Sequence, residues 1–132
     1  MLDPAYITYL AHFHGTRDYF ECHEILEERW KQDRPLDRHS IFVAFIQLAV
    51  ALYHHRRNNF TGAQKMLKKG RTKFFMHEHK ISSYGLHKEK FFLLLNKLET
   101  NLEEHIPYKD IDLPITDELL IEAVQVECRK LD

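Results

Sequence analysis

The chain has 132 residues, of which 44% are hydrophobic and 12% aromatic, enough apolar material for the core of one domain. Its formal net charge is −1, which gives the molecule as a whole no strong attraction to nucleic acid or to an anionic surface. No stretch reaches the roughly 18 apolar residues that a membrane span needs, and the N-terminus lacks a signal-peptide pattern. We therefore expect a single domain over residues 1–132, cytoplasmic and not associated with a membrane.

Four glycines and four prolines are fewer than folds rich in tight turns use, which favours an all-α class. The two cysteines, Cys22 and Cys128, lie at opposite ends of the chain without a paired motif, so we interpret both as thiols. Core packing is the expected role of Cys22, because the adjacent His23 diverges from it by about 100° on a helix.

The first predicted helix opens at Asp3-Pro4, since aspartate caps free N–H groups and proline is tolerated in the first turn, and it ends near Gly15. The second runs from about residue 16 to 31 and carries an apolar stripe. That stripe comprises Tyr19, Cys22, Leu26 and Trp30, widened by Phe20 and Ile25. We predict that Leu26 and Trp30 are largely buried against the third helix.

The third predicted helix, from about residue 37 to 57, contains the apolar run IFVAFIQLAVALY and is the central one. Asn58-Asn59 ends it, and a fourth helix follows whose other positions are mostly lysine and arginine. The stripe of that helix is Phe60, Ala63, Leu67, Gly70 and Phe74.

A turn at residues 82–85 precedes a fifth helix that ends near His105, and an extended connector leads to Pro114. Thr116 is the expected cap of the last helix. Its predicted inner face is Leu119, Leu120, Ala123, Val124 and Leu131. The whole pattern predicts a compact bundle of five or six helices, built on the antiparallel hairpin of the second and third.

One group of polar residues stands out in the segment YFECHEILEERW. A spacing of four places His23 and Glu27 one above the other on the second helix, beside the apolar stripe. The facing third helix offers two polar groups on an apolar surface. The candidate site residues are therefore His23, Glu24, Glu27, Trp30, Gln47 and His54, and no catalytic residue is assigned.

Three interpretations of this polar cluster stay open. A satisfied hydrogen-bond network holding two helices in register is favoured, because buried polar groups need partners. A ligand pocket would use Trp30 as a wall and Glu27 as a polar anchor. A divalent metal site would use His23, Glu27 and His54 in a small metal-dependent enzyme, although the second histidine of the zincin motif is absent.

The segments YFECHEILEERW and FIQLAVALYHHRRNNFTGAQKML together resemble the signature of the DUF309 family. That signature is a His-Glu-x-x-Glu-x-x-Trp helix, a Gln-Leu-Ala-Val-Ala-Leu-Tyr helix and an Asn-x-x-Gly-Ala turn, covering roughly residues 12–70 here. Asn58 stands where the family commonly has glycine. The resemblance implies a compact helical bundle and implies no activity.

The basic fourth helix permits a further alternative, RNA binding through phosphate contacts and aromatic stacking. An exposed lysine-rich face is, however, ordinary for an amphipathic helix, and the acidic end of the chain, from Glu99 to Glu127, is a candidate to cover it. No phosphate loop or nucleophile motif favours an enzyme. We thus favour a helical binding or interaction module whose partner is a protein or a small ligand, and a homo-oligomer is compatible with the sequence.

Overall fold

The structure, a computed structural model, describes residues 2–131. Within this range the chain forms six α-helices and no strand, apart from an isolated bridge between Leu86 and Ile115. The helices are α1 Pro4–Ala11, α2 Tyr19–Trp30, α3 Ile41–Arg56, α4 Phe60–Met76, α5 Lys88–Glu103 and α6 Glu118–Lys130. A π-helical turn over His12–Thr16 and two short 3-10 turns complete the structure. The predicted all-α bundle is confirmed.

Short polar side chains fix where most of the helices begin. Asp3, Asp18, Ser40 and Asn59 each accept a backbone N–H from the first turn of α1, α2, α3 and α4, which satisfies one donor that the helix itself cannot. The prediction that Thr116 caps the last helix is wrong. Asp117 takes this position and accepts from the Leu120 N–H at 3.1 Å, adding a favourable negative charge at the helix N-terminus.

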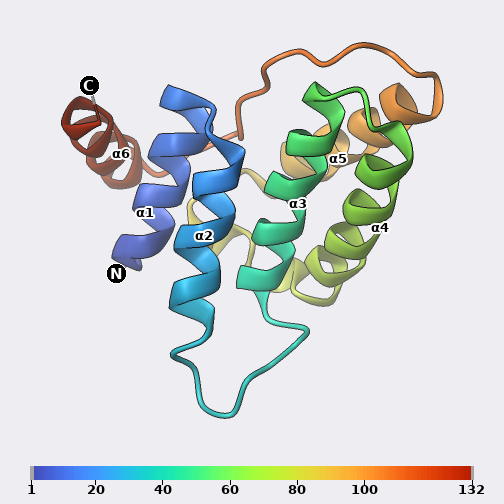
Figure 1. The fold of residues 1–132 in the computed structure, drawn as a ribbon. Helices are drawn as coiled ribbons and strands as arrows, with labels where there is room; N and C mark the ends of the chain where they lie inside the picture. Colours follow the sequence, from blue (N-terminus) through green and yellow to red (C-terminus); the bar gives the residue numbers. More distant parts are fainter. Residues whose placement is uncertain (1, 132) are drawn as a thin grey trace.

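The α2–α3 hairpin lies at the centre of the molecule, as predicted, with α4 packed along the other side of α3 (Figure 1). Gly70 makes this second contact close. A Cβ at Gly70 would lie 3.2 Å from the Ala44 carbonyl oxygen and 3.3 Å from the Gln47 Cβ. The three helices α2, α3 and α4 therefore form one layer, with residues 31–40 looping out between α2 and α3 at one end.

The core is rich in aromatic rings contributed by several helices. Tyr6, Tyr9, Phe45, Phe74 and Phe91 are fully buried, and Phe45 and Phe74 meet edge to face at 4.9 Å. The Tyr9 hydroxyl donates to the Phe45 carbonyl at 2.8 Å, so this polar group is satisfied inside the core.

The inner face of α2 is narrower than predicted. Leu26 is fully buried as predicted, whereas Trp30, which was predicted to be largely buried, is only partly buried against the core. Phe20 is 56% exposed, so it does not widen the buried stripe. Its ring lies beside His23 and Tyr53 instead, at 6.1 and 6.5 Å between ring centres.

The connector between α5 and α6 crosses one end of the helical layer from α4 to α1 (Figure 1). The buried His55 ring contacts the Ile106 carbonyl through Nε2 at 2.8 Å, and Arg17 pairs with Asp112 at 2.7 Å. Tyr19 and Tyr108 share a hydrogen bond between their hydroxyls at 2.5 Å. These anchors fix the path of an otherwise extended segment.

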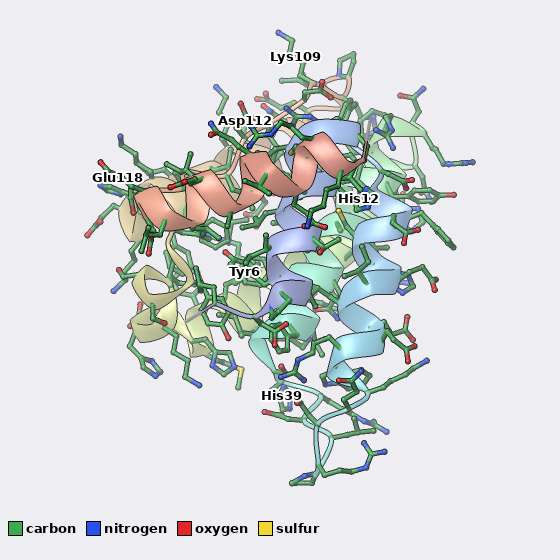
Figure 2. All side chains as sticks on the ribbon, turned by 90° about the vertical axis from the view of Figure 1, so that its left-hand side faces the viewer. Tyr6, His12, His39, Lys109, Asp112 and Glu118 are labelled. Atoms are coloured by element: carbon green, nitrogen blue, oxygen red, sulfur yellow. The ribbon has the colours of Figure 1, made fainter. Side chains whose placement is uncertain are left out.

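Helix α6 lies across α1 (Figure 2), on the opposite side of the molecule from α4. Leu120 and Val124 are its buried residues, whereas Leu119 is 79% exposed. Placing Leu119 on the inner face was therefore wrong, because adjacent helical residues point about 100° apart and only one of the two leucines faces α1. Across residues 2–131, no helix combines the length and the apolar character that crossing a membrane requires.

Candidate functional site

A cavity of about 520 Å³ opens between α2, α3, α4 and the loop at residues 31–40. All three helices contribute side chains to it, and one wall is apolar. Its lining residues are His23, Glu27, Trp30, Arg38, Val43, Ile46, Gln47, Lys69 and Lys73. Four of the six residues predicted from the sequence as a site thus line one cavity.

On the α2 side, the His23–Glu27 pair forms as the spacing predicts. His23 Nε2 lies 2.7 Å from a Glu27 carboxylate oxygen, and the other oxygen of Glu27 lies 3.5 Å from the Lys31 ammonium. Glu24 is 3.4 Å from His23 Nδ1 but is itself exposed and does not line the cavity. The Glu27 carboxylate is therefore compensated by positive or hydrogen-bonding groups on its own helix.

On the facing side, the Lys73 ammonium donates a hydrogen bond to Gln47 Oε1 at 3.0 Å. Desolvation by burial, with a further contribution from the charge of Lys69, lowers the pKa of Lys73 below its usual value. Among residues 2–131 no carboxylate lies within 4.0 Å of Arg38, Lys69 or Lys73. This side of the cavity consequently carries positive charge without a matching anion.

His54 does not join this cluster. Its Nδ1 accepts a hydrogen bond from the Asn59 amide at 3.3 Å, and its ring packs edge to face on Tyr53. His54 therefore supports the turn into α4, where Asn58 adopts a left-handed φ of 61°, the conformation that explains a preference for glycine at this position. The predicted ligand set of His23, Glu27 and His54 is not assembled.

A different set of metal-ligand groups does come together on α2. Ligand atoms of His23, Glu24 and Glu27 lie within 4.8 Å of one another. All three belong to two turns of one helix, and no residue of α3 or α4 adds a fourth ligand to this group. The arrangement can hold a divalent cation only at the surface of α2.

Sequence reasoning missed five of the nine lining residues: Arg38, Val43, Ile46, Lys69 and Lys73. One signal pointed to Lys73, which lies three residues after Gly70 and therefore on the same side of α4 as this close contact with α3. Arg38 lies in an irregular loop, and no periodic pattern indicates where its side chain points.

A second cavity, of about 480 Å³, lies between α4 and α5. Its charges are largely matched, since Arg71 pairs with Glu99 at 2.9 Å and also donates to the Asn96 amide oxygen. Phe75 also lines this cavity, and the Arg71 guanidinium lies over its ring at 5.5 Å from the ring centre. This cavity is the less suitable candidate for a charged ligand.

Comparison with known proteins places the chain in a family. Residues 6–66 match the sequence profile described as Domain of unknown function (DUF309). Over 131 residues the chain is 49% identical to the uncharacterized protein YpuF of Bacillus subtilis (strain 168), a similarity that covers 98% of this chain and 75% of that protein. The chain belongs to the DUF309 family. No solved structure matches it significantly.

In this DUF309 protein the matched segment contains most of α1, all of α2 and α3, and the first part of α4. It includes His23, Glu27, Trp30 and Gln47, so the resemblance predicted from the α2 and α3 motifs is confirmed. Lys69 and Lys73 lie just beyond the family match. The similarity to YpuF extends through α5 and α6, which the motif resemblance did not reach.

Proposed function

We propose that this DUF309 protein is a binding module that takes a small ligand into the cavity between α2, α3 and α4. The observation that carries the proposal is the lining of that cavity, in which an apolar wall faces a few polar groups from three helices. Small-molecule sites typically have this composition and a volume of about 300–1,000 Å³. A cytoplasmic location is part of the proposal, and a chain with only two cysteines and no paired cysteine motif fits it.

Trp30 supports the proposal because its ring is already held in place. The indole N–H donates to the Asp37 carbonyl at 2.9 Å, and the ring is partly buried against the core. Val43 and Ile46 continue the apolar wall along α3. A ligand would therefore meet a preformed surface, which reduces the entropy lost on binding.

Binding is favoured over catalysis by the groups that the site lacks within the described residues. No serine, threonine or cysteine lines the cavity, and the Cys22 thiol is fully buried and donates to the Tyr9 carbonyl. The His23–Glu27 pair offers acid–base chemistry, but no hydroxyl or thiol nucleophile lines the cavity with it. The site therefore fits recognition better than covalent catalysis.

A metal-dependent function is the second candidate, and the proximity of His23, Glu24 and Glu27 is the observation that favours it. We rank it second because all three ligands come from one helix surface. Its test is the melting temperature with zinc, manganese and chelator. A metal that binds only the folded protein raises this temperature in the wild type and fails to do so in His23→Ala.

The single tryptophan of the chain makes the first candidate directly measurable. Because Trp30 lines the cavity, a bound fragment changes the intrinsic fluorescence, and a fragment set titrated against the protein should contain saturable binders. Val43→Phe, which fills the cavity, should abolish these responses. Thr72→Phe, the same kind of enlargement in the α4–α5 cavity, should leave them intact. Responses that survive Val43→Phe would contradict the proposal.

A further inference from the structure

The charges around the cavity are unequal, and their placement restricts the ligand. Three cationic side chains line it, and Glu27 is its one carboxylate among the described residues. Glu27 already contacts His23 and Lys31, so it does not neutralise the cations on the opposite wall. The α4 side of the cavity therefore presents positive potential to any molecule that enters.

Lys73 is the best placed of these cations for contact with a ligand. Its ammonium has three N–H donors, and its hydrogen bond to Gln47 uses one of them. Gln47 also fixes the direction of the ammonium, because the amide lies on α3, the helix packed against α4. Two directed donors remain for a bound oxygen atom in a partly desolvated setting, where charge-assisted hydrogen bonds are strong.

Lys69 stands one helical turn before Lys73 on α4, and Arg38 reaches the same cavity from the loop. The charge of Lys69 already acts on Lys73, since it contributes to the lowered pKa of that group. Two cations held this close without an acidic partner repel each other. An anion between them removes the repulsion and gains two favourable contacts.

We propose that the ligand is a small organic anion whose carboxylate or phosphate group binds Lys73, Lys69 and Arg38 while its apolar body packs on Trp30, Val43 and Ile46. This inference rests on the proposed function, because it assigns a ligand class to the same cavity. It adds that the charge of the head group, and not the apolar wall alone, determines which molecules bind.

The test compares three probes that share a nitrophenyl ring, which quenches tryptophan fluorescence by energy transfer. Para-nitrobenzoate and para-nitrophenyl phosphate carry the two kinds of anionic group, and para-nitrobenzyl alcohol is their neutral counterpart. Quenching of Trp30 should saturate with at least one anion at a concentration about tenfold below that for the alcohol, the difference expected for one charged hydrogen bond. The stronger anion identifies the head group, and inorganic phosphate or acetate should compete with it.

Lys73→Gln provides the decisive variant, because the amide keeps a polar group beside Gln47 and removes the charge. It should weaken anion binding about tenfold and leave binding of the alcohol unchanged. Lys65→Gln is the matched control, since Lys65 is an exposed lysine of the same helix that lines neither cavity. This control should bind both probes as the wild type does.

Two results overturn the anion inference while leaving the proposed function intact. One is equal binding of anionic and neutral probes, and the other is anion binding that Lys73→Gln does not weaken. Saturable binding of neutral fragments with no response to either anion has the same meaning. If no fragment and no probe gives a saturable response, the proposed function fails together with the inference.

Discussion

Cys22 and Cys128 have the same side chain but different burial, and burial determines how reactive each thiol is. The Cys22 thiol is fully buried, and burial raises the pKa of this thiol far above its ordinary value. Cys128, on α6, is only partly buried. Because the thiolate is the reactive species, we predict that a maleimide labels Cys128 in the folded protein and reaches Cys22 only after denaturation.

Mass spectrometry of digested protein after labelling near pH 7.5, with and without urea, measures this difference. Cys128→Ser should then show almost no labelling without urea, whereas Cys22→Ala should label like the wild type. Equal modification of both cysteines in the native protein would mean that the packing between α1 and α2 opens readily. It would also contradict the core role that the sequence predicted for Cys22.

The polar residues of the site divide into those that local spacing could predict and those it could not. His23 and Glu27 are four residues apart on one helix, so their contact depends on helical geometry alone. Gln47 and His54 also share a face of α3, but two turns separate them, a distance of about 10 Å along the helix. Being on the same face did not bring them to the same site, so Gln47 lines the cavity and His54 does not.

At the scale of elements, Gly70 controls how closely α4 approaches α3. In a helix interior, alanine in place of glycine stabilises the folded protein by about 0.5–1 kcal/mol. Its Cβ would, however, meet the Ala44 carbonyl oxygen and Gln47 Cβ at 3.2 and 3.3 Å, and both belong to the helix packed against α4. We predict that Gly70→Ala lowers the free energy of unfolding by about 1–2 kcal/mol, because overpacking forces two helices apart.

Urea denaturation measures this change, and Thr72→Ala is the control on the exposed side of the same helix. Thr72→Ala should be neutral or slightly stabilising, because alanine is the better helix former. If Gly70→Ala stabilises the protein as well, the α3–α4 contact is looser than these distances indicate. The same variant should also alter binding of fragments in the cavity, which Gln47 lines.

The helices themselves were largely predictable, since the stripe of Ala63, Leu67, Gly70 and Phe74 is buried as its spacing predicts. The predictions for α6 were wrong where two neighbouring residues suited the same role, either on the inner face or as the helix cap. Leu119 and Leu120 are equally apolar, and Thr116 and Asp117 are both good caps. Tertiary contacts made the choice, because only one orientation of α6 places Leu120 in the core beside Gly85.

At the scale of the whole molecule, the sequence did not predict where the acidic end of the chain lies. This stretch was a candidate to cover the basic face of α4, and it does so only in part. Glu99 of α5 pairs with Arg71 of α4, whereas α6 packs on α1 at the far side of the layer (Figure 1). The path between them follows from individual anchors such as Arg17 with Asp112 and His55 with Ile106. Such contacts between distant segments have no periodic signal in the sequence.

The exposed position of α4 makes RNA binding a question of how many cations remain available. Arg71 pairs with Glu99, and Lys73 points to Gln47 in the cavity. Lys65, Lys68 and Lys69 are the exposed lysines of this helix. With three phosphate contacts, the logarithm of the binding constant for a single strand falls with the logarithm of salt concentration with a slope of about −2. Three contacts are too few for tight binding at physiological ionic strength.

We therefore predict that a fluorescein-labelled oligouridine does not bind the protein at micromolar protein concentrations and about 0.15 M salt, where screening of charges is substantial. Fluorescence anisotropy at low and physiological salt measures this directly. The triple variant with glutamine at Lys65, Lys68 and Lys69 should abolish any weak binding that appears at low salt. Its fluorescence response to the organic anions should persist through Lys73 and Arg38, though weakened by the loss of Lys69. Sub-micromolar RNA binding at physiological salt, removed by the triple variant, would instead make the outer face of α4 the functional surface.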